Sequence, residues 1–172
     1  MNGAAHGNRW QTVLGLDPGL GTTGYGVVSS ARNGVRLVEG GTLRTSSDHS
    51  LPIRLAEIYR GVARIIEEFR PDVVVIEELY SKYAHPRTAI LMGHARGVAC
   101  LAAAQAGVQV VGYAPAAMKR ALTGNGRASK QQVARAVCAH LGIEAVPRSS
   151  DVTDALALAV CHCFVGTAPS PS

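Results

Sequence analysis

Long apolar segments are absent from this sequence of 172 residues. No apolar run approaches the roughly 20 residues that a helix needs to cross a bilayer. The N-terminus also lacks a charged stretch followed by an apolar one, which is the pattern of a secretory leader. We therefore expect a protein without membrane segments that works in the cytoplasm. Repeats and linker-like stretches are lacking too, and this length suits a single folded domain.

Cysteines with the spacing of metal ligands are also lacking. The four cysteines are Cys100, Cys138, Cys161 and Cys163. None is separated from another by the two to four residues typical of paired zinc ligands. All four lie in segments with helical periodicity, where Cys161 and Cys163 project from different faces. We interpret them as small apolar residues rather than zinc ligands or disulfide partners.

Acidic residues are fewer than basic ones. The sequence has 12 Asp and Glu against 17 Lys and Arg, which gives a formal net charge of +5. A basic balance of this size favours a polyanionic partner, although many basic proteins bind no nucleic acid. The hydrophobic content of 47% predicts a globular core.

The order of expected elements predicts an α/β fold. Three strands, at about 12–17, 24–30 and 35–43, are joined by short turns and predict an antiparallel meander. The segments expected after them are a helix at 52–69, a strand at 73–76, a helix at 87–106, a strand at 108–111 and helices at 115–122, 130–141 and 151–165. We expect a five-stranded mixed sheet flanked by helices, as in the ribonuclease H-like fold. This single domain would span 11–165, with disordered ends at 1–10 and 166–172.

Acidic residues occupy the ends of two expected strands and the start of the last helix. Asp17 ends the first strand and Glu77 ends the fourth, so the two carboxylates would lie close together if these strands are neighbours. Asp151 and Asp154 are three residues apart and therefore share one helix face. Periodicity does not distinguish Glu77 from Glu78, because this strand is apolar on both faces.

Four converging carboxylates would repel one another strongly in a partly buried site. Divalent ions with a preference for oxygen ligands relieve such repulsion, which indicates magnesium or manganese. A two-metal carboxylate site is suited to the hydrolysis of phosphodiester bonds. The alternative is structural: Asp17 would cap a turn, and Asp151 and Asp154 would charge a helix start. His162 shares the helix face but lies about three turns away, so we expect it to pack rather than bind metal.

Four motifs of the chain resemble those of a known family in order and spacing. They read LGLDPGLGTTGYGVV, VVVIEELY, HARGVA and SDVTDALALAVCHC. The sequence is similar to the RuvC family of Holliday-junction resolvases over about 11–164. The resemblance implies that the catalytic and metal-binding acids are Asp17, Glu77, Asp151 and Asp154, and it favours Glu77 over Glu78. Some members carry His in place of the third acid, so Asp151 is the least constrained.

The resemblance also implies an activity and its partners. The family has a ribonuclease H-like fold and acts as a homodimer that resolves four-way DNA junctions by paired symmetric nicks. It is a crossover junction endodeoxyribonuclease of homologous recombination and DNA repair that uses Mg²⁺ or Mn²⁺, with two ions expected per site. It works beside the RuvA–RuvB branch-migration complex, which would place this protein at the nucleoid in a bacterial cytoplasm.

Six residues are candidates for contacts with DNA. Tyr80 resembles the aromatic residue that the family inserts at the junction crossover, where it would stack on a base. The other five are the basic residues Lys82, Arg87, Lys119, Arg127 and Lys130. Lys119 and Lys130 resemble basic residues near the scissile strand, and Lys130 begins a helix, where anions bind readily. The structural alternative for each of these residues is an ordinary solvated surface.

Three other functions are compatible with parts of the pattern. A related ribonuclease H-like nuclease acting on RNA or on another branched substrate would carry the same acids. A sugar-kinase or actin-like ATPase also begins with Asp-x-Gly, but it needs two such lobes. A non-catalytic junction-binding module would not need the full set of acids.

Overall fold

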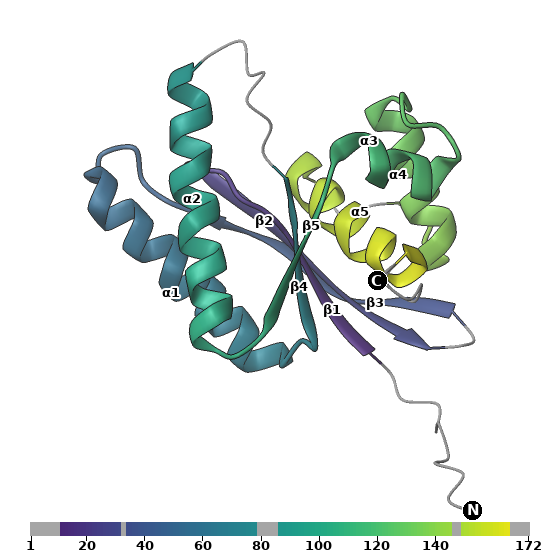
Figure 1. The fold of residues 1–172 in the computed structure, drawn as a ribbon, viewed down its shortest axis with the longest axis horizontal. Helices are drawn as coiled ribbons and strands as arrows, with labels where there is room; N and C mark the ends of the chain where they lie inside the picture. Colours follow the sequence, from purple (N-terminus) through teal and green to yellow (C-terminus); the bar gives the residue numbers. More distant parts are fainter. Residues whose placement is uncertain (1–10, 32–33, 79–85, 146–148, 166–172) are drawn as a thin grey trace, which may run out of the picture.

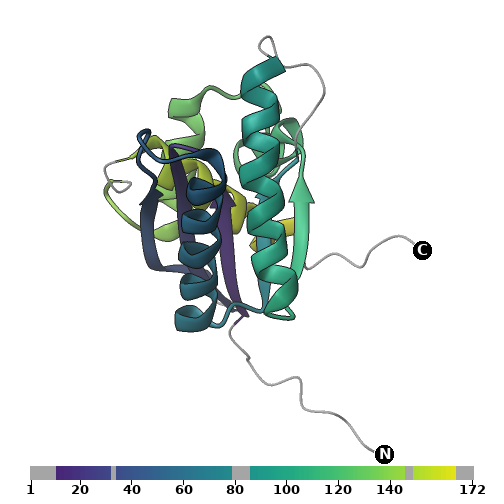
Figure 2. The same ribbon diagram turned by 90° about the vertical axis from the view of Figure 1, so that its left-hand side faces the viewer.

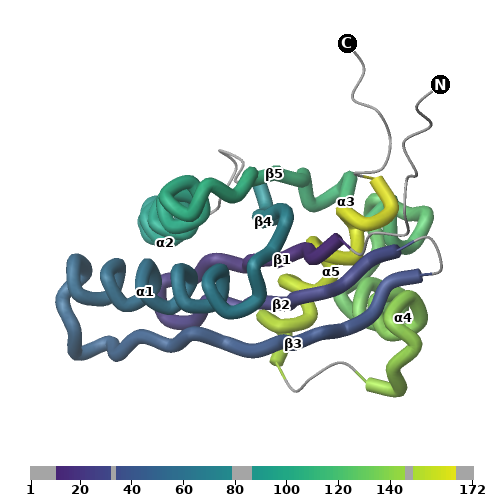
Figure 3. The backbone as a smooth tube through the Cα atoms, turned by 90° about the horizontal axis from the view of Figure 1, so that it is seen from below, coloured from purple at the N-terminus to yellow at the C-terminus, as the bar shows by residue number. Residues whose placement is uncertain are grey.

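The structure, a computed structural model, describes residues 11–31, 34–78, 86–145 and 149–165. Its centre is one sheet of five strands in the order β3-β2-β1-β4-β5. The strands are β1 (Gln11–Asp17), β2 (Thr22–Ala31), β3 (Gly34–Arg44), β4 (Val73–Glu77) and β5 (Gln109–Tyr113). β3 and β5 form the two edges of the sheet (Figure 3).

The strand pairings confirm the predicted combination of an antiparallel meander with parallel strands. β1 pairs with β2 and β2 with β3 in antiparallel fashion, whereas β1–β4 and β4–β5 are parallel. The register between β1 and β4 places Leu16 opposite Ile76. Because the two strands are parallel, the next residues, Asp17 and Glu77, leave the sheet at the same edge.

Helices cover both faces of the sheet (Figure 1). They are α1 (Leu51–Phe69), α2 (Pro86–Gln105), α3 (Pro115–Thr123), α4 (Lys130–Leu141) and α5 (Ser150–Val165). Helices α1 and α2 lie next to each other on one face (Figure 2), and α3, α4 and α5 lie on the other. Within the described ranges, no helix is long and apolar enough to cross a membrane.

The sheet separates two hydrophobic cores. Alternate residues of β4 enter different cores: Val73 and Val75 pack with α3, α4 and α5, and Val74 and Ile76 pack with α1 and α2. The run Val73–Ile76 is therefore buried on both faces, as the continuous apolar sequence predicts. Burial on both sides fixes the position of the strand that carries Glu77.

Helix α5 lies directly on β1 and β2 because glycines face it. A Cβ atom at Gly15 would lie 2.0 Å from the carbonyl oxygen of Ala155, and one at Gly24 would lie 2.1 Å from that of Asp151. No side chain fits between two main chains at such distances. The two glycines therefore allow the acid-bearing helix to approach the sheet backbone.

Two local predictions are also confirmed. The capping box at the start of α4 is present, with the side chain of Ser129 accepting from the backbone of Gln132 and the Gln132 side chain accepting from the backbone of Ser129. His162 is buried, and its Nδ1 forms a hydrogen bond of 2.9 Å with the hydroxyl group of Tyr113.

All four cysteines are free thiols, of which Cys161 and Cys163 are buried and the other two half-buried.

Candidate active site

Three of the four predicted acids line one cavity of about 350 Å³. Its charged lining consists of Asp17, Glu77, Asp154, Lys119 and Lys130. Its apolar lining consists of Met92, Pro115, Met118 and Val133. Acids that are 60 to 137 positions apart in the sequence thus share one concave surface with two lysines.

Each of the three acids is placed by a different buried element. Asp17 is the last residue of β1 and Glu77 the last residue of β4, at the end of two neighbouring parallel strands. Asp154 lies near the start of α5, whose following residues Ala155 to Cys163 are all buried. The acids are therefore presented by the core of the protein rather than by surface loops.

The acids of the cavity act on one another through their charges. Burial, and then the charges of Asp154, Glu77 and Asp151, raise the pKa of Asp17 from 3.8 to about 7, while Lys130 opposes the rise. Burial and the charge of Asp154 likewise raise the pKa of Glu77, against the opposing charges of Lys130 and Lys119. Repulsion of this kind is the physical reason for a site to take up cations.

Lys130 supplies the cation that faces Asp154 in this structure. Its Nζ donates a hydrogen bond of 2.9 Å to Oδ2 of Asp154. This hydrogen bond and the charge of the carboxylate raise the pKa of Lys130 above its ordinary value. The ammonium group therefore stays protonated and partly neutralises the cavity.

Asp151 does not line the cavity. Its Oδ2 accepts a hydrogen bond of 3.1 Å from the hydroxyl group of Ser149, and its backbone N–H donates a hydrogen bond of 3.2 Å to Oγ of Ser149. Its charge still reaches Asp17, since it contributes to the raised pKa of that acid. Asp151 thus lies at the rim of the site, outside the lining of the cavity, and is hydrogen-bonded to Ser149 at the start of α5.

The structure separates Glu77 from Glu78. Glu77 faces the cavity, whereas Glu78 is exposed and its side chain passes over Gly112 of β5. A Cβ atom at Gly112 would lie 2.8 Å from Cγ of Glu78. Consecutive side chains at the end of a strand point to opposite sides, which explains the difference.

The candidate DNA-contacting residues fall into three groups. Lys119 and Lys130 line the cavity itself. Arg127, in the connection between α3 and α4, and Arg87, in the first turn of α2, are exposed. Tyr80 and Lys82 lie outside the described residues.

Two residues of α2 belong to the surroundings of the site but were not predicted from the sequence. Met92 lines the cavity, and Nε of Arg96 donates a hydrogen bond of 3.1 Å to the backbone carbonyl of Glu77. The two are four residues apart and so lie on one helix face. The motif HARGVA contains Arg96, but a hydrogen bond to a main-chain oxygen 19 positions away leaves no local signal in the sequence.

The side chains around the cavity fit a hard divalent cation. Asp17, Glu77 and Asp154 offer carboxylate oxygens, the donors that magnesium and manganese prefer. Their mutual repulsion, which adds to burial in raising the pKa of Asp17, would fall on binding a cation. Among the described residues, no three acidic, histidine or cysteine side chains are already gathered as a ligand set. The carboxylates would therefore have to adjust to bind an ion.

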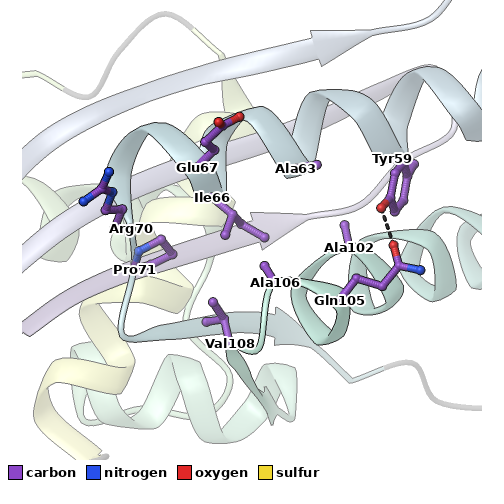
Figure 4. Close-up of a pocket in the computed structure, with 10 residues that line it drawn as sticks. All are labelled: Tyr59, Ala63, Ile66, Glu67, Arg70, Pro71, Ala102, Gln105, Ala106 and Val108. Atoms are coloured by element: carbon purple, nitrogen blue, oxygen red, sulfur yellow. Dashed lines mark hydrogen bonds between the residues drawn. The ribbon is translucent and has the colours of Figure 1, made fainter.

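A second cavity, of about 580 Å³, lies between α1 and α2 (Figure 4). Pro71 and Val108, which line it, precede β4 and β5, so the cavity is at the opposite end of these strands from Glu77. Tyr59 of α1 donates a hydrogen bond across it to Gln105 of α2. Apolar side chains such as Ala63, Ala102 and Ala106 line it together with Glu67 and Arg70, and it lacks the clustered acids of the first cavity.

Comparisons with known proteins agree with this geometry. The family model described as "Crossover junction endodeoxyribonuclease RuvC" matches residues 13–162. A protein of this name from Rhodopirellula baltica is 47% identical over 159 residues, which cover 91% of this chain and 88% of the relative. Another from Rubrobacter xylanophilus is 45% identical over 154 residues, covering 90% and 86%.

Solved structures of junction resolvases share the fold. The structure of Thermus thermophilus RuvC in complex with a Holliday junction substrate superposes with a TM-score of 0.85 at 37% identity, covering 91% of this chain and 94% of that one. The yeast mitochondrial Holliday junction resolvase superposes with a TM-score of 0.68 at 15% identity, covering 90% and 78%. The second match concerns the fold alone and, with the first, confirms the predicted ribonuclease H-like architecture.

Proposed function

The chain belongs to the RuvC family of crossover junction endodeoxyribonucleases, and we infer that it uses Asp17, Glu77 and Asp154 to resolve four-way DNA junctions by hydrolysing phosphodiester bonds. The observation that carries this assignment is the convergence of these three acids with Lys119 and Lys130 in one cavity. A substrate with two equivalent strands is cut by paired symmetric nicks. The biological setting that follows is homologous recombination and DNA repair.

RuvC nucleases depend on metal ions, and we assign Mg²⁺ or Mn²⁺, two ions per site, to this protein. Asp17, Glu77 and Asp154 would hold them, with Asp151 at the rim as a fourth ligand. Bound ions of this kind activate water and stabilise the leaving oxygen of a phosphodiester. His162 is not a ligand in this proposal, because Tyr113 engages its Nδ1.

The protein's own residues then orient and retain the DNA strand. Lys119 and Lys130 in the cavity would pair with phosphate oxygens, and the apolar side chains of Met92 and Met118 would pack against the bound strand. Arg96 holds the backbone carbonyl of Glu77 and thereby fixes the end of β4. Arg87 and Arg127, which are exposed, would contact phosphates farther along the strand, together with Tyr80 and Lys82.

Cleavage of synthetic substrates tests the proposal. With Mg²⁺, the protein should nick a four-way junction at symmetric positions and leave a linear duplex and an RNA–DNA hybrid of the same sequence largely uncut. Asp17→Asn should retain junction binding and lose cleavage by at least about 100-fold, because the site then lacks one charged ligand. Faster cutting of the hybrid would instead favour the related nuclease, and undiminished cleavage by the variant would refute the assignment.

We also propose a homodimer in which helix α2 meets its copy. Ile90, Gly97 and Leu101 lie on one side of α2, and Ile90 and Leu101 are 61% and 50% exposed. A methyl group at Gly93 or Gly97 would meet no atom within 4 Å, so this side is open to a close neighbour. Beside Leu101, an apolar cavity of about 440 Å³ bounded by Leu55, Ala56, Tyr59, Val98 and Gln105 could accept a partner side chain. Two-fold symmetry would give two sites for the two strands to be cut.

By the same family relationship, we propose that the protein works with the RuvA–RuvB branch-migration complex in a bacterial cytoplasm, at the nucleoid. The relatives reported above are bacterial. Co-sedimentation with purified RuvA–RuvB on a junction, compared with the junction alone, tests the partnership.

A further inference from the structure

The contact between Lys130 and Asp154 joins two groups that the reaction needs separately. Asp154 is one of the three acids of the cavity, and Lys130 is one of its two lysines. In this structure the lysine Nζ lies 2.9 Å from Oδ2 of the acid. While this contact persists, one carboxylate oxygen is engaged by an ammonium group, and that ammonium group is held at the acid rather than at a phosphate.

The two partners are held very differently. Asp154 belongs to the buried helix α5, and its side chain is 27% exposed. The side chain of Lys130 is 78% exposed, although its backbone is fixed as the first residue of α4 by the Ser129 capping box. An exposed lysine side chain gains little from an ion pair and can rotate away at small cost. The acid is therefore the fixed member of the pair and the lysine the movable one.

Lys119, the other lysine of the cavity, can be compared directly with Lys130. It lines the same cavity and, like Lys130, lowers the pKa of Glu77 by its charge. Within the described part of the chain, however, no hydrogen bond joins its ammonium group to an acid. The two lysines thus add the same charge to the site but differ in whether they engage a carboxylate.

We propose that Lys130 is a built-in counter-ion that a divalent ion displaces from Asp154, and that its released ammonium group then binds a phosphate of the DNA strand. The proposal rests on the proposed function for the identity of the ion and the strand. It couples the two ligands, because the metal frees the lysine that the DNA requires. In the metal-free protein the lysine limits the repulsion among the acids.

Calorimetry of Mg²⁺ binding without DNA tests the displacement. Lys130→Met should bind Mg²⁺ about two- to fivefold more tightly than the parent protein, beyond the gain given by the matched control Lys119→Met, because a surface ion pair competes with the metal by about this factor. Equal gains in the two variants would mean that charge alone matters and would overturn the proposal. Circular dichroism and melting curves establish that both variants are folded before titration.

A second measurement follows the lysine itself. The chain contains three lysines, Lys82, Lys119 and Lys130, so acetic anhydride labelling of the full-length protein can be read by mass spectrometry at each of them. Labelling of Lys130 should rise severalfold when Mg²⁺ is added, and more than that of Lys119. In Asp154→Asn it should already be high and respond little to the metal.

The outcomes separate this proposal from the proposed function. A protein that cuts junctions but shows no metal-dependent labelling of Lys130 would refute the displacement and leave the nuclease assignment intact. A protein that shows the displacement but cuts no junction would refute the nuclease assignment alone.

Discussion

Asp17 is the acid whose pKa is raised by burial first and then by the neighbouring carboxylates of the site. Its pKa is about 7 in the folded protein against 3.8 as the ordinary value, so the folded state holds a proton more firmly than the unfolded state does. Between about pH 4 and pH 7, the stability of the metal-free protein therefore falls as pH rises, and above pH 7 the loss is constant. Glu77, whose pKa is also raised, acts in the same direction.

The fall in stability with rising pH gives a prediction for Asp17→Asn in the presence of EDTA. The variant should be more stable than the parent at pH 8 by about 1–3 kcal/mol, and the gain should shrink toward pH 5 because the parent acid is then protonated. Thermal unfolding at both pH values measures it. Lys130 does not obscure the result, since its pKa lies above this range in both states. An equal gain in stability at pH 5 and pH 8 would show that the charge of Asp17 does not destabilise the folded protein.

The position of helix α5 depends on glycines in the strands beneath it. In Gly15→Ala, the new Cβ atom would lie 2.0 Å from the carbonyl oxygen of Ala155, so α5 must move outward and carry Asp154 with it. We expect a loss of about 3 kcal/mol in stability together with a loss of junction cleavage. Denaturant unfolding and the cleavage assay measure the two effects.

Gly21→Ala is the matched control for stability. The nearest atom to a Cβ at this exposed position is the far end of the Arg54 side chain, at 3.8 Å. This change should alter stability by no more than about 0.5 kcal/mol. Similar losses in both variants would argue that the effect comes from chain flexibility rather than from the close packing of α5.

The elements themselves were largely predictable from the sequence, whereas their contacts were not. Hydrophobic periodicity and turn residues place the strands and helices to within a few residues, and the acids at strand ends indicate the site. β5 continues to Tyr113, beyond the expected residue 111, because Tyr113 pairs with Glu77 across the sheet. The close approach at Gly15, the hydrogen bond from Arg96 and the engagement of Asp154 by Lys130 all depend on residues distant in sequence, which no local pattern encodes.

At the scale of the whole molecule, the proposed dimer predicts a difference between two exposed apolar positions. Leu101 on α2 and Val38 on β3 are 50% and 48% exposed. Leu101→Glu would bury a charge between two protomers and should shift the protein to monomers, since an unpaired buried charge is costly. Val38→Glu, the matched control, should leave the dimer intact. Sedimentation velocity distinguishes the two, and a dimer that survives Leu101→Glu would exclude this face of α2.

The contact of α5 with the sheet also bears on redesign of the protein. Where main chain rests on main chain, the separation between Asp17 and Asp154 is set by atoms that every amino acid possesses. The core on the other face of the sheet can then be given larger or more rigid side chains, in search of heat tolerance, without changing the spacing of these two acids. A library of core variants should hold Gly15 and Gly24 constant and vary the side chains between the sheet and helices α1 and α2.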